Sequence, residues 1–413
     1  MTINNEHKKL NAPNKQEQNQ TCLDSAEREG LRPKGNVPNL RFPEFQWEWE
    51  KCKLGELTTK VGSGSTPKGG NAVYTPVGRC FVRSQNVGMG YLLLDDIAHI
   101  NEDIHQKHKA TELNENDVLL NITGASIGRT AIATKEIEGG NVNQHVCIIR
   151  ANSKVSPKFL CNYIQTKKIQ KYIQSLQTGG SREGLNFEQI RSFPISLPSI
   201  AEQNKIAQLL DKLNERIATQ SKIIEDLKKL KCAIAERLFK VTNGDVVILS
   251  DVCNIQKGKQ VNGDCLSENG TYYVMNGGTE PSGYYEQCNT PANTISISEG
   301  GNSCGYVQYN RDAFWSGGHC YSLTDIQSNV CNLYLYHYLK SKESAIMKLR
   351  IGTGLPNIQK KDLEKFAVLL PPVAKQVRIS TFLTAIERKT TNEEILLSHF
   401  QEEKQYLLRQ MFI

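Results

Sequence analysis

Two motifs, Leu197-Pro-Ser-Ile-Ala-Glu-Gln203 and Leu370-Pro-Pro-Val-Ala-Lys-Gln376, lie near the start of a long segment that occurs twice in this chain. The segment runs from Ser192 to Phe239 and again from Lys365 to Phe412, without a gap, at an offset of 173 positions (365 minus 192). A repeat of this length decides how the rest of the chain divides into domains. Because proline suits the first turn of a helix, each motif predicts a helix start.

Apolar residues within the repeat recur at alternating steps of four and three. This spacing puts them on one stripe of a helix and requires a partner helix. Each helix would hold about 40 residues and extend ~60 Å. We expect the two to pair as an intramolecular antiparallel coiled coil. Its seam would contain Ile206, Leu210, Leu213, Ile217, Ile224 and Leu227, continuing to Ile234 and Leu238, and Ile379, Leu383, Ile386, Leu397 and Phe400, continuing to Leu407 and Met411.

Polar residues interrupt the stripe at equivalent places in both copies. Gln220 matches Glu393, and Lys231 matches Lys404. A polar residue on a coiled-coil seam can fix the register and the choice of partner. Alternatively, the two lysines lay their aliphatic stems on the seam and reach water with their ammonium groups. The sequence leaves both interpretations open.

Composition limits the class of protein. A net charge of +7 and a pI near 8.7 are mildly basic and compatible with nucleic acid. No apolar run approaches the ~18 residues that would span a bilayer, and Met1–Gln20 lacks the apolar core of a signal peptide. The twelve cysteines are dispersed without a C-x-x-C pair, which is typical of reduced thiols and not of a metal site. We therefore expect a cytoplasmic protein without a membrane partner or a bound metal.

The segments outside the repeat read as short strands and Gly-rich turns, and the second half replays the plan of the first. The predicted fold class is α+β, with two mixed, β-rich domains separated by two long helices and related by a pseudo-two-fold internal repeat. The helices repeat closely while the globular parts diverge, as expected of one scaffold that carries two recognition surfaces. The predicted boundaries are a disordered tail at 1–35, domains at 36–191 and 244–364, and helices at 192–243 and 365–413.

Catalytic motifs are absent from the sequence. An adenine methyltransferase would need a Gly-rich cofactor loop and an Asn/Asp-Pro-Pro-aromatic tetrapeptide, and the sequence has neither. There is no phosphate-binding P-loop, no H-E-x-x-H and no G-x-S-x-G. The stretch Gly62-Ser-Gly-Ser-Thr66 lacks the third glycine of a nucleotide loop and is better explained as a turn. We therefore expect no catalytic residue and no cofactor bound by this chain.

Binding chemistry remains, in loops that occupy matching places in the two halves. Lys and Arg neutralise phosphates, Arg can read guanine, and Asn and Gln can read adenine. Any one of these residues is better explained as solvated surface, so their clustering carries the argument. The candidate DNA-binding residues are Ser65, Thr66, Lys68, Arg83, Asn86, Thr123, Ser126, Arg129, Gln144, His145 and Arg182 in the first half, and Lys257, Lys259, Gln260, Asn276, Asn302, Ser303, Arg311 and His319 in the second.

Four further motifs accompany the helix-start motifs: Val37-Pro-Asn-Leu-Arg-Phe-Pro43, Gly64-Ser-Thr-Pro67, Thr123-Gly-Ala-Ser-Ile-Gly128 and Asn143-Gln144. With these motifs, the chain resembles the specificity subunit of a type I restriction–modification system. The resemblance covers residues 36–413. One departure is Lys375, at a position where the family usually has Glu and the first copy has Glu202. This change weakens one expected polar contact without disturbing the helix.

The resemblance implies a division of labour. Each globular part would be a target recognition domain that reads one half of a bipartite site in double-stranded DNA. The helices would set the spacing between half-sites, near one turn of B-DNA or ~34 Å. They would also dock two modification subunits, which bring S-adenosylmethionine and methylate adenine at N6. Two restriction subunits would complete the complex and use ATP and Mg.

Two other classes of function stay open. A coiled-coil adaptor with two protein-binding heads would have the same helices but would not bind DNA sequence-specifically. A self-contained DNA methyltransferase would methylate DNA as a purified chain given S-adenosylmethionine, although the missing motifs argue against it.

Overall fold

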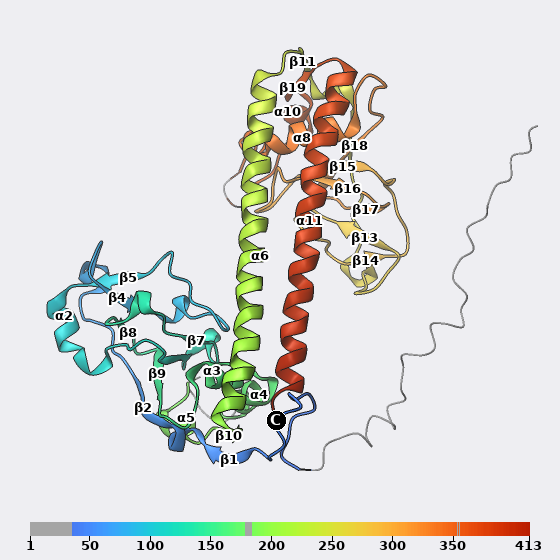
Figure 1. Ribbon diagram of the computed structural model, residues 1–413. Coiled ribbons are helices and arrows are strands. Elements are labelled where there is room, and N and C mark those ends of the chain that lie inside the picture. The colour runs from blue at the N-terminus through green and yellow to red at the C-terminus, as the bar shows by residue number, and fades with distance from the viewer. Residues whose placement is uncertain (1–34, 178–183, 353, 355) are drawn as a thin grey trace, which may run out of the picture. The chain divides into compact units, whose positions relative to one another are not determined.

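Two long helices dominate the computed structural model, which describes residues 35–177, 184–352, 354 and 356–413 (Figure 1). Helix α6 spans Ile200–Val241 and helix α11 spans Val373–Gln410, which are 42 and 38 residues. They run antiparallel and pack together. Each helix begins two residues after the proline of its motif, Pro198 or Pro371, and has close to the predicted length of about 40 residues; both begin eight residues after the predicted segment boundaries at 192 and 365.

The chain divides into two compact units. The first unit contains residues 35–217 and 399–413, and the second contains residues 218–398. Each unit therefore combines one β-rich domain with the beginning of one long helix and the end of the other. The boundaries predicted from the sequence instead place each long helix whole in a segment of its own.

The first unit is built from short strands and short helices ahead of α6. Its strands are β1 Glu50–Lys53, β2 Thr58–Ser63, β3 Tyr74–Thr75, β4 Arg79–Val82, β5 Ala98–Ile100, β6 Val118–Asn121, β7 Thr130–Ile132, β8 Asn141–Val142, β9 Val146–Ala151 and β10 Pro194–Leu197. Its short α-helices are α2 Glu102–Lys107, α3 Pro157–Gln165, α4 Lys167–Ser175 and α5 Phe187–Arg191.

The second unit has a closely similar set of elements. Its strands are β11 Asp245–Ile248, β12 Asn254–Lys257, β13 Tyr272–Met275, β14 Tyr284–Tyr285, β15 Thr294–Ser298, β16 Val307–Asn310, β17 Trp315–Ser316, β18 Cys320–Thr324 and β19 Ala367–Leu370. Its short helices are α7 Leu249–Val252, α8 Asn332–Ser341, α9 Glu343–Met347 and α10 Lys360–Glu364.

The two domains share one sheet topology. The main sheet has the strand order β2-β9-β6-β7 in the first unit and β12-β18-β15-β16 in the second. In the smaller sheet, β4 pairs in parallel with β8, and β13 pairs in parallel with β17. These matching orders establish the α+β class with two β-rich domains, and they show that the second half replays the plan of the first.

The repeated helix-start motif makes the same three hydrogen bonds in both units. The side chain of Gln203 accepts from the Ser156 N–H and donates to the carbonyls of Lys154 and Pro198. Gln376 likewise accepts from the Cys331 N–H and donates to the carbonyls of Asn329 and Pro371. Both glutamines are buried. Losing either would leave buried backbone groups unpaired, so the motif fixes where each helix leaves its domain.

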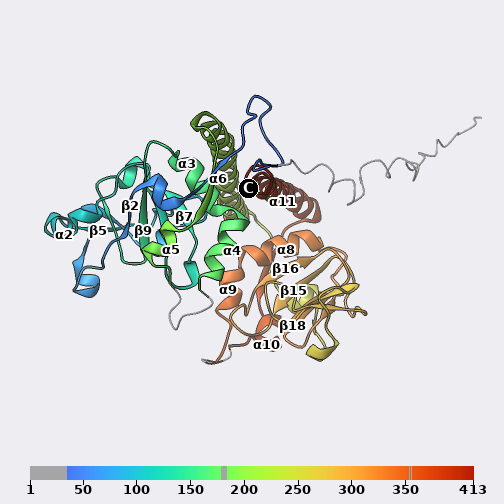
Figure 2. The same cartoon turned by 90° about the horizontal axis from the view of Figure 1, so that it is seen from below.

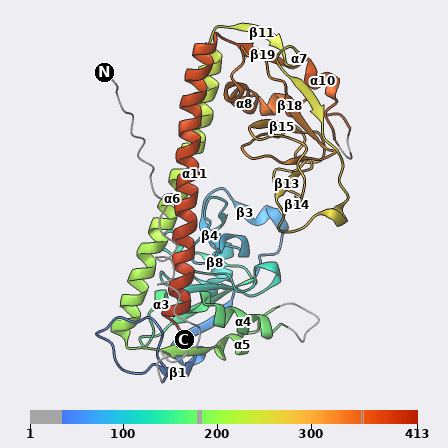
Figure 3. The same cartoon turned by 90° about the vertical axis from the view of Figure 1, so that its right-hand side faces the viewer.

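A short antiparallel ribbon supports each helix start. Strand β1 pairs with β10 in the first unit, and β11 pairs with β19 in the second, at the end of α6 and the start of α11 (Figure 3). In the second unit, helix α8 packs beside α11 (Figure 2) and shares a hydrophobic core with it. The β-rich domain and the helix pair of a unit thus share one core.

The repeat ends in an aromatic residue that enters this core. In the first unit, the ring of Phe412 lies 5.2 Å from Phe159 and 5.6 Å from Tyr163. In the second unit, the ring of Phe239 lies 5.8 Å from Tyr334 and 5.3 Å from Tyr338. Each long helix therefore starts on one domain's core and ends on the other's.

The predicted seam is buried unevenly along the helix pair. Ile206, Leu210, Leu213, Ile224, Ile379 and Leu383 are buried, whereas Ile217, Leu227, Ile386, Leu397 and Phe400 are partly buried. Towards the helix ends Leu407 and Met411 are buried, but Ile234 and Leu238 are only partly so, while the neighbouring Ala235, Phe239 and Leu408 are buried. The stripe thus turns slowly around the helix, because 3.6 residues per turn do not match a strict heptad.

The polar interruptions of the seam have partners. Gln220 donates to the backbone carbonyl of Glu393 at 3.1 Å, and Lys231 forms an ion pair with Glu387. Lys404 donates to Gln165 at 3.0 Å, and burial lowers the pKa of its ammonium group. Since Lys404 is buried, it does not reach water, and the polar-seam interpretation describes it better.

Candidate nucleic-acid interface

Strand pairing gathers three loops at one end of the main sheet in the first unit. Ser63 at the end of β2 lies opposite Cys147, and Asn121 at the end of β6 lies opposite Val146 at the start of β9. The Gly-rich loop after β2, the turn after β6 and the loop before β9 are therefore neighbours. Gly64 is required there, because a Cβ on it would overlap the carbonyl of Val142.

Four of the predicted residues form a hydrogen-bonded chain across these loops. Thr66 donates to Gln144, whose Nε2 lies 3.1 Å from His145 Nε2. The Nδ1 of His145 lies 2.5 Å from the hydroxyl of Thr123. This chain joins all three loops and presents amide, imidazole and hydroxyl groups, which can donate to or accept from base edges.

The turn after β6 has a close counterpart in the second unit. Gly124 and Gly128 adopt φ of 67° and 86°, and Gly301 and Gly305 adopt 76° and 92°. Residues other than glycine rarely adopt such values. The first turn holds Ser126, half-buried, and is followed by the exposed Arg129; the second holds the exposed Asn302 and the half-buried Ser303. The same backbone thus displays different side chains in the two units.

Other predicted residues of the first unit have different surroundings. Asn86 is 1% exposed and holds a turn by accepting from the Arg83 N–H and donating to the Leu93 carbonyl, so it cannot contact DNA in this structure. Arg83 forms an ion pair with Asp96. Ser65 lies 2.9 Å from His108, and Lys68 is exposed. Arg182 lies outside the described residues.

The matching end of the main sheet in the second unit carries a charged cluster. Lys257 Nζ lies 2.6 Å from Glu299 Oε1, which also accepts from the Tyr321 hydroxyl at 3.0 Å. His319 Nδ1 lies 3.6 Å from Glu299 Oε2, and Asn276 accepts from the His319 N–H. Lys257, Asn276, Glu299 and His319 line a pocket of about 570 Å³, together with glycines 277, 278, 300 and 301. Burial, followed by the charge of Glu299, raises the pKa of Tyr321, which stays protonated.

Sequence reasoning missed Glu299. It is 8% exposed, and its Oε2 has no hydrogen-bond partner among the described residues. A carboxylate in this position can accept from the amino group of cytosine. The signal was an acidic residue at the end of an otherwise neutral strand, directly before Gly300-Gly301.

Sheet geometry separates Arg311 from this cluster. Asn310 pairs with Thr294 at the beginning of β15, whereas Glu299 follows the end of that strand. Arg311 therefore lies at the opposite end of the sheet. Lys259 and Gln260 are exposed in the loop after β12 and remain near the cluster, since the N–H of Lys259 bonds to Ser316.

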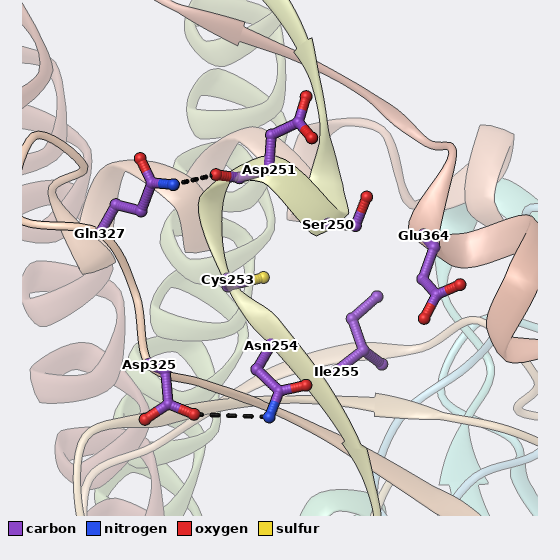
Figure 4. Close-up of a pocket in the computed structure, with 8 residues that line it drawn as sticks. All are labelled: Ser250, Asp251, Cys253, Asn254, Ile255, Asp325, Gln327 and Glu364. Atoms are coloured by element: carbon purple, nitrogen blue, oxygen red, sulfur yellow. Dashed lines mark hydrogen bonds between the residues drawn. The ribbon is translucent and has the colours of Figure 1, made fainter.

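A separate pocket, lined by residues of α7, β12 and α10, is acidic (Figure 4). Asp251, Asp325 and Glu364 line it, and Asn254 donates to Asp325 at 3.4 Å. Carboxylates repel phosphate, so this pocket is unsuited to the DNA backbone. In the described part of the chain, no group of three or more His, Cys, Asp and Glu side chains could hold a metal ion.

Comparison with known proteins identifies the architecture. The family model described as "Type I restriction modification DNA specificity domain" matches residues 47–229 and 243–398. This chain belongs to that family. The two matches include both β-rich domains and most of both long helices, so the resemblance drawn from the sequence motifs is confirmed.

Curated relatives of this family are similar over different lengths. A Mycoplasma pneumoniae protein named as a type I specificity subunit is 34% identical over 131 residues, which is 32% of this chain and 34% of that protein. One from Methanocaldococcus jannaschii is 23% identical over 392 residues, 85% of this chain and 90% of its own. The type I restriction enzyme EcoBI specificity subunit of Escherichia coli is 28% identical over 139 residues, 32% of this chain and 28% of its own. The chain thus spans about a third of the first of these relatives.

Solved structures share the fold. The crystal structure of a type I restriction-modification S subunit from M. genitalium has a TM-score of 0.64 at 18% identity, covering 91% of this chain and 99% of its own. A chain from a study of complex assembly in the type I system has a TM-score of 0.53 at 18% identity, covering 90% and 99%. No helix in the described part of this family member is long and apolar enough to cross a membrane.

Proposed function

We propose that this chain is the non-catalytic DNA-recognition subunit of a type I restriction–modification complex, and that each β-rich domain reads one half of a bipartite DNA target. Residues 36–191 and 244–364 would be the two recognition domains. The antiparallel helices would set the distance between half-sites and dock the partner subunits. Such a subunit would work in the cytoplasm, where the DNA lies.

One observation carries the proposal: a single topology presents two different sets of side chains at equivalent places. His145 precedes β9 and His319 precedes β18, so the two histidines are equivalent. His145 contacts a neutral hydroxyl of Thr123, whereas His319 faces the carboxylate of Glu299. Two domains that recognise the same DNA sequence would be expected to carry the same side chains at these places. Two domains that recognise different half-sites would not.

The loop geometry supports a proposed DNA-contacting surface in each domain. In the first domain we propose Thr66, Thr123, Ser126, Arg129, Gln144 and His145, with Ser65, Lys68 and Arg83 at the margin. In the second we propose Lys257, Lys259, Gln260, Asn276, Asn302, Ser303 and His319, with Glu299 added. Arg129 and the lysines would neutralise phosphates, while the amide, imidazole and carboxylate groups would read base edges. Asn86 and Arg311 are left out of these surfaces.

The chemistry would come from partners. Two modification subunits would bind S-adenosylmethionine and methylate adenine, and two restriction subunits would use ATP and Mg. This chain would contribute sequence selection and would bind none of these cofactors itself.

The test is genome-wide adenine methylation in cells that carry this chain with its cognate modification subunit, compared with cells that lack this chain. We expect a split motif: two short half-sites around a spacer of fixed length. His145→Ala should relax one half-site and His319→Ala the other. Methylation that does not depend on this chain would contradict the proposal.

A coiled-coil adaptor with two protein-binding heads is the second candidate, and the same experiment separates it. An adaptor would associate with its partners without a methylation motif and without sequence-specific DNA binding by the complex. Methylation by the purified chain alone would instead point to a methyltransferase.

A further inference from the structure

An N-terminal arm covers one face of the helix pair in the first unit. We define the arm as residues 36–49. The N–H of Leu40 donates to the carbonyl of Gln410 near the end of α11. Near the start of α6, Glu202 accepts two bonds from the Arg41 guanidinium, at 2.7 and 2.8 Å. The arm therefore bridges the end of one long helix and the start of the other.

The arm holds its place with alternating charges and aromatic rings. Glu44 forms an ion pair with Lys205, and the ammonium group of Lys205 lies 4.6 Å from the ring centre of Phe42. Trp49, at the end of the arm, is buried and donates to Glu202 at 3.3 Å. Arg41 and Glu44 of the arm are three residues apart. They pair with Glu202 and Lys205 of α6, which are also three residues apart.

The second unit has an equivalent face, and there it is open. In the 173-residue repeat, Lys375 corresponds to Glu202, Arg378 corresponds to Lys205 and Leu238 corresponds to Met411. These residues line an apolar groove of about 1050 Å³. Val241 and Phe382, which also line it, are 66% and 51% exposed.

The connection between α6 and β11 explains why no arm covers this groove among the described residues. Three residues, 242–244, separate Val241 from Asp245, so the chain has no room for a second arm. The strand registers make Gly244 the counterpart of Trp49, because Glu50 lies opposite Leu197 and Asp245 opposite Leu370. A Cβ on Gly244 would lie 2.7 Å from the backbone of Leu370. The connection therefore supplies no counterpart of Trp49 to fill the groove.

Charge selects the occupant. The first unit presents one acidic and one basic side chain to the arm, Glu202 and Lys205. The second unit has two basic side chains at these positions, Lys375 and Arg378. Neither Lys375 nor Arg378 has a carboxylate partner within the described residues. The arm of a second copy would place Arg41 against Lys375, which is unfavourable. An occupant with carboxylates at both positions would be complementary.

We propose that this groove binds an extended segment of the modification subunit, in which two carboxylates three residues apart flank an aromatic residue. The segment would occupy the place that the arm holds in the first unit. This inference rests on the proposed function for its source. Beyond that function, the inference names a binding site for the segment. It also gives the segment's sequence pattern: an acidic residue, an aromatic residue, any residue and a second acidic residue.

The first experiment measures the groove alone, by fluorescence anisotropy on the full chain. The probes are two labelled peptides spanning Asn36–Glu50, one unchanged and one with Arg41→Glu. The peptide with Arg41→Glu should bind about five- to tenfold more tightly, because it replaces a repulsion with an attraction. In the Lys375→Glu chain, which restores the charge of the first unit, the preference should reverse. An unchanged preference would overturn the proposal.

The second experiment identifies the source of the segment. Purified modification subunit should displace the bound Arg41→Glu peptide, and Lys375→Glu with Arg378→Glu should weaken its association with the chain. The matched control is Lys222→Glu with Arg388→Glu, two exposed basic residues on the same helices outside the groove. If both pairs have equal effects, or the peptide is not displaced, the assignment to the modification subunit is wrong. The methylation test of the proposed function stays separate, since it reads the target motif of the unaltered complex.

Discussion

At the scale of single residues, His337 is a buried histidine with consequences for stability. It lies in α8, and its Nε2 is 2.9 Å from the hydroxyl of Thr384 on α11. Burial lowers the pKa of His337 to about 4; the nearby Glu387 acts in the opposite direction and Lys231 in the same direction. The imidazole is therefore neutral in the folded protein but titrates near 6.5 when the chain unfolds.

This shift predicts a loss of stability in mild acid. Because the unfolded state binds more protons between pH 6.5 and 4, the contribution of His337 is complete above pH 6.5 and declines as the pH falls towards 4. We expect the free energy of unfolding to drop by about 2 kcal/mol between pH 7 and 5 from this group. Denaturant unfolding at both pH values measures it.

The control for this prediction is His337→Gln, which keeps a polar group near Thr384 but does not titrate. The variant should lose about 2 kcal/mol less than the unaltered chain over the same pH range. The pKa of Glu387 is also lowered, because although burial raises it, the hydrogen bond and charge of Lys231 outweigh that effect. Its contribution is lost mainly below pH 4.5, outside the measured range. Equal pH dependence in both chains would show that His337 is not the cause.

The candidate interface shows what residue types can and cannot predict. The sequence placed Thr123, Gln144 and His145 correctly in loops, and the structure joins them by hydrogen bonds. It could not show that Asn86 turns inward, because an asparagine that caps a turn and one that reads a base have the same side chain. Glu299 was not predicted as a site residue, because its role depends on the loop before β18, which is distant in sequence.

At the scale of the helix elements, the seam predicts a sharp contrast between adjacent leucines. Leu210 is fully buried between the helices, whereas its neighbour Leu209 is 36% exposed. Leu210→Asp would put a charge into a dry core and should cost about 4 kcal/mol or more, while Leu209→Asp should cost less than about 1 kcal/mol. Leu383→Asp should have the effect of Leu210→Asp in the second unit, because Leu383 is equally buried.

Thermal unfolding and association with the modification subunit together test this contrast. The seam interpretation would be wrong if Leu210→Asp melted at the same temperature as Leu209→Asp and still assembled. The heptad was readable from sequence because apolar spacing alone specifies a stripe. The burial of Phe239 and Phe412 was harder to predict from the sequence, because it depends on contacts with the tyrosines and Phe159 of the domain cores that the two rings enter.

At the scale of the whole molecule, the division into two units follows from how each helix is anchored. Helix α6 is anchored to one domain by Gln203 near its start and to the other by Phe239 near its end. Its length is therefore constrained by its contacts with both domains. The sequence showed the repeat and the alternation of domains and helices. The shared topology required the structure, because the strands are short and their pairing joins residues far apart in sequence.

The proposed spacing role leads to a quantitative prediction. Removing seven residues from each helix, Ser221–Leu227 and Thr391–Leu397, deletes one heptad from both and keeps the seam in phase. Gln220 directly precedes the first stretch and bonds to Glu393 within the second, so the two deletions lie close together along the helix pair of the second unit. Seven residues correspond to ~10 Å of helix, and thus to about three base pairs of B-DNA.

The variant should therefore methylate the same two half-sites around a spacer about three base pairs shorter. Unchanged half-sites are the internal control, because the reading loops are untouched. Removing Ser221–Leu227 alone should instead abolish assembly, since the partner helix would face a seam of different length. An assembled double-deletion complex that kept the original spacer would mean that something other than the helix pair sets the distance, such as bending of the DNA between half-sites.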